Sequence, residues 1–152
     1  APGLVEWLSD VSPLQVELAK PDTRIENGHV YVANTGLHMQ ITPQYRIVLS
    51  SGPAVDGQRP SGNLLLESIA EAAGSNAIGV LLTGMGNDGA RGLQAIFQQG
   101  GKTIAQDEST SLIYGMPKAA MEMNVVHYSL PLPQIAEQII RLSGIKSADW
   151  MQ

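Results

Sequence analysis

The chain has 152 residues, no cysteine, 14 acidic and 9 basic side chains, and a net charge of −5. This length suits one domain with a buried core, and the lack of cysteine excludes disulfides and is typical of a cytoplasmic protein. The basic residues are scattered and no apolar run approaches the roughly 20 residues that cross a bilayer, so we expect neither a nucleic-acid partner nor membrane insertion.

The first 60 residues predict one short helix followed by short strands. Residues 3–9 read as the helix, and residues 15–19 alternate like a strand. Three more apolar runs, each separated from the next by turn residues, lie at 29–33, 37–41 and 45–49. Such a run of short strands predicts antiparallel hairpins.

After a Gly, Pro and Ser-rich loop at 50–60, helices and strands alternate. The predicted helices are Ser61–Ala73, Ala90–Gln99, Met116–Met123 and Pro133–Leu142. The predicted strands are Ala77–Thr83, Lys102–Gln106 and Asn124–Ser129. The alternation predicts an α/β fold: a three-layer, doubly wound, mainly parallel sheet (Rossmann-like) with an antiparallel hairpin extension. We expect residues 143–152 to be a tail that docks, if at all, through Trp150.

One glycine-rich turn joins a buried-type strand to a helix. Gly84, Gly86 and Gly89 spell G-x-G-x-x-G, the pattern of a dinucleotide site, and Asp107 stands where a ribose-binding carboxylate would lie. Asp88, however, lies inside the turn, where its charge would repel a pyrophosphate at the helix N-terminus. The fingerprint also usually follows the first strand of its unit, whereas nearly eighty residues precede it here. We therefore expect no nucleotide cofactor.

Two roles for Asp88 follow from its position. It can cap the N-terminus of the following helix, a common contact worth about 1 kcal/mol. It can also orient a histidine, as the acid of a Ser-His-Asp system does, because open α/β sheets place their sites at the carboxyl ends of strands. Spacing leaves both roles open. Tyr114 and Met116 follow a neighbouring predicted strand, so we expect them to wall a cleft near Asp88.

The turn Thr83-Gly84-Met85-Gly86-Asn87-Asp88-Gly89-Ala90 resembles the signature of the chemotaxis protein-glutamate methylesterases, the CheB catalytic domain. Further segments resemble that family in the same order and spacing. They are Gly28-His29-Val30-Tyr31-Val32-Ala33, His38-Met39, Arg59-Pro60-Ser61 and Gly115-Met116-Pro117-Lys118-Ala119-Ala120. The likeness extends from about Gly3 to Leu142 and is specific as a combination.

The resemblance implies a hydrolase with a doubly wound α/β fold that acts in two-component chemotaxis signalling. It implies hydrolysis of γ-glutamyl methyl esters, often with deamidation of glutamines, on chemoreceptor helices by a Ser-His-Asp triad. The family's aspartate corresponds to Asp88, and its oxyanion turn to Met85 and Gly86. The implied partners are methylated chemoreceptor helices and an upstream receiver or other regulatory domain.

The chain departs from the family pattern in two ways. The glycine-rich serine turn and the catalytic histidine motif are both absent. Ser61 is better explained as a helix cap, and Ser109 and Ser111 as turn residues. His29, His38 and His127 lie in strand patterns, where structural roles are expected. No H-E-x-x-H motif, cysteine or close His/carboxylate cluster predicts a metal site.

Residues 1–142 are therefore expected to be the C-terminal part of a methylesterase catalytic domain that lacks its N-terminal βα segment, which leaves the chain inactive alone. The alternative is a catalytically inactive methylesterase-like binding or regulatory module. In either form, apolar strand edges left open by the missing segment would require a covering partner.

Overall fold

The computed structural model describes residues 2–144. The helices are α1 (Pro2–Val11), α2 (Gly62–Ala73), α3 (Ala90–Gln98), α4 (Met116–Glu122) and α5 (Leu132–Ser143), with a 3₁₀ turn at Gly74–Asn76. The strands are β1 (Gln15–Leu18), β2 (His29–Val32), β3 (His38–Ile41), β4 (Ile47–Ser50), β5 (Ile78–Leu81), β6 (Lys102–Gln106) and β7 (Tyr128–Leu130). Over these residues, none of the helices is long and apolar enough to cross a bilayer.

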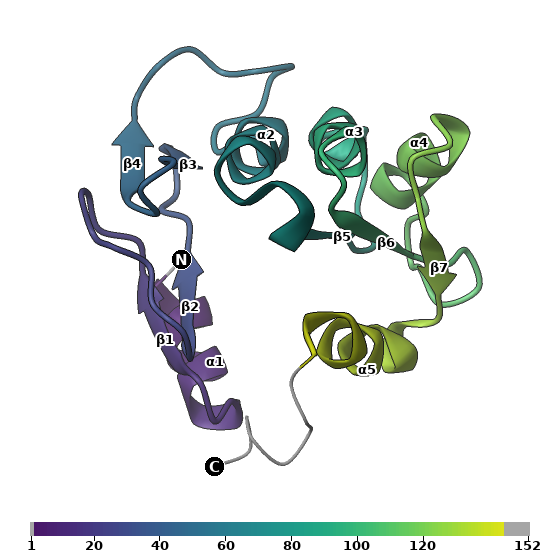
Figure 1. Cartoon of the computed structure of the whole chain (residues 1–152), viewed down its shortest axis with the longest axis horizontal. Coiled ribbons are helices and arrows are strands. Elements are labelled where there is room, and N and C mark those ends of the chain that lie inside the picture. The colour runs from purple at the N-terminus through teal and green to yellow at the C-terminus, as the bar shows by residue number, and fades with distance from the viewer. Residues whose placement is uncertain (1, 145–152) are drawn as a thin grey trace.

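The second half of the chain forms a parallel sheet in the order β5-β6-β7. Leu81 pairs with Ala105, and Ile104 with Tyr128. Helices α3 and α4 lie on one face of this sheet and α5 on the other, with α2 beside α3 (Figure 1). Helices on both faces explain why β5 has almost no polar side chain. The predicted α/β class and its parallel sheet are confirmed.

The first half confirms one predicted hairpin and corrects another. Strands β3 and β4 pair antiparallel, as expected. Strand β2, however, pairs in parallel with β1, from Gln15–His29 to Leu18–Val32. The connecting segment does not turn back tightly; its residues Asp22 to Ile25 hydrogen-bond with residues 45–47 beside β4 before the chain returns to β2. Such a crossover permits parallel pairing, and the strand pattern alone does not reveal it.

The bounds of β7 and α5 differ from those predicted. The strand predicted over Asn124–Ser129 is confined to β7, because Asn124 adopts a left-handed conformation with φ of 58° and the chain runs irregularly to His127. Helix α5 continues to Ser143, and the rest of the predicted tail, Trp150 included, lies outside the described residues.

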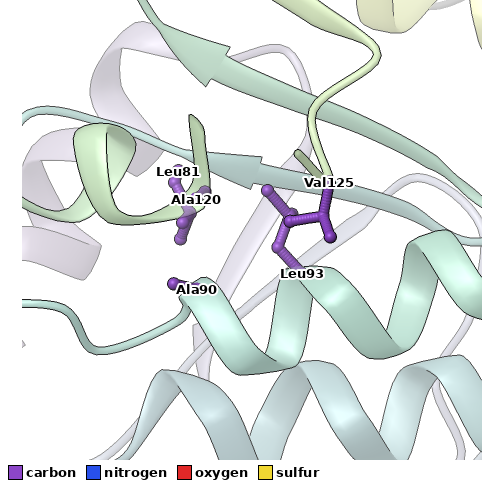
Figure 2. Close-up of a cluster of buried hydrophobic side chains, with 5 residues drawn as sticks. All are labelled: Leu81, Ala90, Leu93, Ala120 and Val125. Atoms are coloured by element: carbon purple, nitrogen blue, oxygen red, sulfur yellow. The ribbon is translucent and has the colours of Figure 1, made fainter. Parts of the chain in front are cut away.

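Apolar side chains from β5, α3, α4 and the segment before β7 form one core. It contains Leu81, Ala90, Leu93, Ala120 and Val125, of which Leu93 and Ala120 are fully buried (Figure 2). A second core lies between the β3–β4 hairpin and α2, which contributes Leu65, Ile69 and Ala72 to it. Helix α2 therefore joins the hairpin to α3.

Gly92 sets the distance between α2 and α3. A Cβ added at this position would lie 2.6 Å from the Leu66 Cβ and 3.1 Å from the Asn63 Cα. Both neighbours belong to α2, and neither is the end of a flexible side chain. The two helices therefore approach as closely as a glycine allows.

His127 lies beside the main sheet and is held in its neutral form. Its ring stacks on Phe97 with centroids 4.6 Å apart, and its Nδ1 accepts a hydrogen bond of 3.1 Å from the Thr103 N–H. Burial lowers the pKa of His127, and the nearby Lys102 lowers it further. A proton on Nδ1 would remove the acceptor for Thr103.

We expect Gly92→Ala to lower the free energy of unfolding by about 1–3 kcal/mol, because the added methyl overpacks the α2–α3 contact. Urea unfolding followed by circular dichroism measures this. Gly3→Ala is the matched control, since a Cβ there meets nothing within 4 Å and alanine favours a helix. Equal stability of the two variants would contradict the packing argument.

The lowered pKa of His127 predicts a pH-dependent stability. Above the unfolded pKa of about 6.5 both states are neutral and the residue contributes nothing. As the pH falls below that value the unfolded chain binds a proton first, so stability is lost down to the folded pKa. Unfolding of wild type and His127→Gln between pH 7.5 and 5 should show a steeper loss in wild type. Parallel curves would refute it.

Candidate functional site

The turn between β5 and α3 carries the residues that the sequence singled out. It lies at the carboxyl end of a parallel strand, where open α/β sheets bind their ligands. Gly86 and Gly89 have φ of 90° and 95°, conformations that side chains disfavour. Met85 at the tip is 79% exposed. The turn is thus a sharp, solvent-facing loop with Asp88 at its base.

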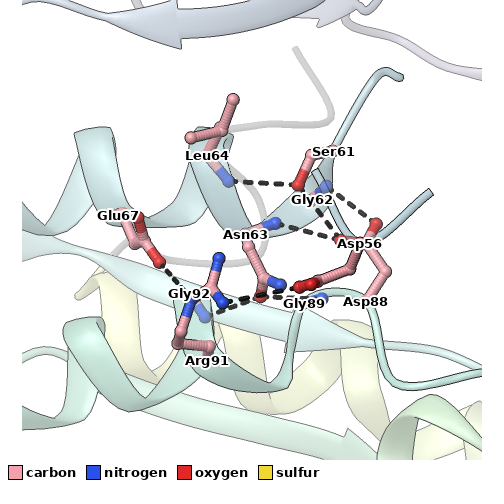
Figure 3. A network of polar contacts seen from close by, with 10 residues as sticks. All are labelled: Asp56, Ser61, Gly62, Asn63, Leu64, Glu67, Asp88, Gly89, Arg91 and Gly92. Carbon is pink, nitrogen blue, oxygen red and sulfur yellow. Dashed lines mark hydrogen bonds and ion pairs between the residues drawn. The ribbon is translucent and has the colours of Figure 1, made fainter. Parts of the chain in front are cut away.

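Asp88 caps a helix, but not the one that follows it. Its Oδ2 accepts a hydrogen bond of 2.8 Å from the Gly62 N–H. Its Oδ1 accepts one of 3.3 Å from the Asn63 N–H and one of 3.2 Å from the Ser61 hydroxyl (Figure 3). The capped helix is α2. The expected cap on α3 is therefore wrong, because Gly89 occupies that N-cap position and Asp88 lies one residue too early.

Asn63 of α2 caps the N-terminus of α3 in the same way. It lies in the first turn of α2 and is 3% exposed. Its side-chain oxygen accepts hydrogen bonds of 3.0 Å from the Gly89 N–H and 2.9 Å from the Gly92 N–H, both at the start of α3 (Figure 3). We call this pair of interactions the reciprocal cap: Asp88 caps α2 while Asn63 caps α3. It satisfies free amides at both helix N-termini.

Ser61 and His38 lie beside Asp88 without forming a triad with it. Ser61 is the N-cap of α2, as expected, and is 1% exposed. The His38 Nδ1 accepts a hydrogen bond of 3.2 Å from the Ser61 backbone N–H, and its Nε2 donates one of 2.8 Å to the Pro53 carbonyl. Both ring nitrogens are thus committed to backbone groups, and His38 does not act as a base toward the Ser61 hydroxyl.

The other serines and histidines also have structural contacts. The Ser109 hydroxyl donates to the Asp107 side chain at 3.2 Å, and the Ser111 hydroxyl donates to the Asp107 carbonyl at 2.6 Å. They are turn residues, as expected. His29 stacks on Tyr31 within β2. Within residues 2–144, no three His, Asp or Glu side chains are grouped so as to hold a metal ion.

A second segment, residues 113–116, holds the turn from the side. The Gly84 N–H donates to the Ile113 carbonyl at 3.0 Å, and the Met116 N–H donates to the Gly84 carbonyl at 3.0 Å. A Cβ on Gly84 would collide with the end of Met116, and one on Gly115 would lie 2.5 Å from the Gly84 carbonyl oxygen. The structure thus brings the Tyr114–Met116 segment to the turn that carries Met85.

Two side chains near the turn have shifted ionisation. Burial raises the pKa of Tyr114, and the acidic side chains around it raise it further, so its hydroxyl stays neutral at physiological pH. A hydrogen bond from Arg91 to Glu67, 3.0 Å long, raises the pKa of Arg91, whose guanidinium also lies 3.4 Å from Asp56. These pairings occupy Arg91 at the surface.

Sequence reasoning missed Asn63 and Gln106, both buried and polar. The Ser61-Gly62-Asn63 sequence predicts the start of a helix, but the neighbouring sequence does not indicate that Asn63 caps a different helix. Gln106 ends a predicted strand, and its side chain accepts a hydrogen bond of 2.7 Å from the Thr83 N–H. The signal that the sequence offers is a glutamine at the last position of the predicted strand Lys102–Gln106.

The sequence model of the CheB methylesterase family matches residues 1–139. The chain belongs to this family. It is 46% identical over 139 residues to the protein-glutamate methylesterase FrzG of Myxococcus xanthus, covering 91% of this chain and 42% of the relative. It is 44% identical over 143 residues to protein-glutamate methylesterase/protein-glutamine glutaminase 1 of Syntrophus aciditrophicus, covering 94% of this chain and 41% of the relative.

The fold also matches a solved CheB domain. The crystal structure of the Thermotoga maritima CheB methylesterase catalytic domain superposes with a TM-score of 0.89 at 33% identity, covering 92% of this chain and 76% of that one. The agreement confirms the α/β architecture of this CheB-family chain. The chain nevertheless spans well under half the length of the curated relatives named above.

We expect Asn63→Ala to lower the free energy of unfolding by about 1–3 kcal/mol, because two buried N–H groups of α3 lose their acceptor. Denaturant unfolding measures the loss, and amide exchange should show faster opening at Gly89 and Gly92. Asn76→Ala removes the same side chain from an exposed position and serves as the control. An Asn63→Ala variant as stable as this control would count against the reciprocal cap.

Proposed function

We propose that this chain is the aspartate-bearing part of a protein-glutamate methylesterase catalytic domain. Its substrates would be γ-glutamyl methyl esters on chemoreceptor helices, with glutamine side chains deamidated by the same acyl chemistry. The observation that carries the proposal is the position of Asp88. It lies in the turn that resembles the family signature, at the carboxyl end of β5, and three donors at the start of α2 hold its carboxylate. Relatives with this domain carry both activities in their names.

Asp88 has the geometry that an orienting acid needs. A carboxylate offers about four acceptor directions, and three are used by Ser61, Gly62 and Asn63. One direction remains for a histidine N–H. The N-terminus of α2 is also a favourable place for negative charge. In the proposed mechanism a serine attacks the ester carbonyl while a histidine takes the serine proton, and that proton passes to the methanol that leaves as the ester C–O bond breaks. A water then hydrolyses the glutamyl–serine ester with the same histidine as base, and Asp88 fixes the histidine tautomer throughout.

The backbone of Met85 and Gly86 would supply the oxyanion contact. Met85 lies at the exposed tip of the turn, and its N–H makes no hydrogen bond within residues 2–144. A free N–H held in a rigid turn can stabilise the negative oxygen of the tetrahedral intermediate. Tyr114 and Met116, which lie against the same turn, would form the neighbouring wall of the cleft.

The serine and the histidine would come from outside these 152 residues. Ser61 is buried and bonded to Asp88, and His38 is committed to backbone groups, so neither can replace them. In the described part of the chain, β5 is the first strand of its sheet and leaves one edge without a strand partner. We propose that residues 1–142 are completed at this edge by a βα segment that carries both missing groups.

The setting follows from the family. The domain would work in the cytoplasm, within two-component chemotaxis signalling, on methylated chemoreceptor helices. A receiver or other regulatory domain would control it.

One observation favours a second candidate, a catalytically inactive binding or regulatory module. Asp88 already has a structural task in the reciprocal cap, so its presence does not require catalysis. The two candidates differ in whether the completed domain hydrolyses an ester.

We expect this chain alone to release no methanol from a methylated receptor fragment, and to release it once mixed with the preceding part of the FrzG catalytic domain. Asp88→Asn should then reduce kcat by about 10⁴-fold, as for other orienting acids, while Asp10→Asn, an exposed exchange on α1, leaves it unchanged. Methanol release is read by gas chromatography. A folded, mixed complex without activity would refute the esterase and favour the module.

A further inference from the structure

Gln106 is a buried polar residue that the proposed mechanism does not use. It ends β6 and is 1% exposed. A buried amide is stable only when its donors and acceptors are all satisfied. The contacts of Gln106 therefore show what its side chain is built to hold.

Both ends of the Gln106 amide have partners on different loops. Its Oε1 accepts a hydrogen bond of 2.7 Å from the Thr83 N–H, at the start of the turn. Its Nε2 donates to the Thr110 carbonyl at 2.8 Å and to the Thr110 hydroxyl at 3.3 Å. The orientation of the amide follows from these partners, because Thr83 offers a donor and Thr110 an acceptor.

The Thr83 contact lies where the sheet stops. The last pair between β5 and β6 joins Leu81 to Ala105, while the backbone of Gln106 pairs with Leu130 of β7. The hydrogen bond from the Gln106 side chain thus continues the contact between the two strands beyond their backbone pairing. It reaches Thr83, which lies two residues after Leu81 and two residues before Met85. The β5–β6 pairing does not extend to Thr83, whose backbone N–H bonds instead with the Gln106 side chain.

The other end of the amide is held by a braced loop. The Asp107 Oδ1 accepts hydrogen bonds from the Thr110 N–H at 3.0 Å and the Thr110 hydroxyl at 2.6 Å. The Thr110 hydroxyl oxygen accepts one from the Leu132 N–H at the start of α5. Gln106 therefore links the turn to a loop tied to α5.

We infer that Gln106 is a positioning residue for the oxyanion turn: by holding the Thr83 N–H, it sets where the Met85 N–H points. The inference rests on the proposed function in naming the reaction. The hydrogen-bond chain from Thr110 through Gln106 to Thr83 carries it. Ile113 holds the side chain of Thr83: the Thr83 hydroxyl donates to the Ile113 carbonyl at 3.0 Å and accepts from the Ile113 N–H at 2.9 Å. Gln106 holds the Thr83 backbone N–H, and the backbone of Gly84 bonds with Ile113 and Met116.

Gln106→Met tests the inference in the mixed, active complex described above. It keeps length and volume but loses both contacts. We expect kcat to fall about 10–100-fold, since a small misplacement of catalytic groups has effects of this size, with KM within about 2-fold. Gln138→Met is the matched control: this buried glutamine lies on α5 and accepts from Arg141. An unchanged kcat in Gln106→Met would overturn the inference.

Gln106→Glu adds a pH readout. When protonated, the new carboxyl group can accept from Thr83 and donate to Thr110, as the amide does. When ionised, it meets the Thr110 carbonyl with a negative charge. The ratio of variant to wild-type kcat should therefore rise as the pH is lowered. A constant ratio across the pH range would contradict a role through these hydrogen bonds.

Amide exchange on this chain alone separates failure of the inference from failure of the proposed function. In Gln106→Met, the N–H of Thr83 should exchange at least about 10-fold faster, while those of Val80 and Leu81 in β5 keep wild-type rates. If the mixed wild type releases no methanol, the proposed function fails, and exchange alone decides whether Gln106 fixes the turn. Unchanged exchange at Thr83 would overturn the inference whatever the activity.

Discussion

The reciprocal cap between α2 and α3 is the constraint on which the site depends. Every helix begins with N–H groups that lack partners inside the helix. Here each helix start is satisfied by a residue at the start of the other, Asp88 for α2 and Asn63 for α3. Neither helix can slide without exposing buried amides of both. Gly92 permits the close approach that this exchange of caps requires.

Under the proposed function, the structural contacts of Asp88 would also suit it to orient a histidine. A carboxylate that must orient a histidine works only if it does not turn, and the donors on α2 hold both of its oxygens. The same contacts would stabilise the fold in a protein without catalysis. The presence of the aspartate therefore says little about activity. The Met85 N–H, in contrast, makes no hydrogen bond within residues 2–144, so it has no structural role there.

The sequence predicted most elements, because periodicity and turn residues act locally. The apolar faces of α2 and α3, the buried strand β5 and the N-cap at Ser61 were all readable in this way. The pairing direction of β2 was not readable in this way. β2 joins β1 in parallel, and the loop between them hydrogen-bonds with residues 45–47, a contact distant in sequence. The sequence offers α3 as the helix that Asp88 caps, and only the tertiary packing shows that the capped helix is α2. The same holds for Asn63 and Gln106, whose partners lie more than twenty residues away.

Hydrogen bonds fix the β5–α3 turn at both ends, while its middle, at Met85, is exposed to solvent. Helix α2 holds its base through Asp88, and Gln106 and Ile113 hold its start through Thr83 and Gly84. Met85, between these anchors, has an exposed side chain and a free backbone N–H within the described residues. Under the proposed function, the chain contributes a fixed acid and a fixed hydrogen-bond donor. Because neither can adjust much, the proposed serine and histidine would need an equally rigid element. In the described part of the chain β5 has no strand partner on its second edge, and a parallel strand added there would end at the same carboxyl edge of the sheet as the turn.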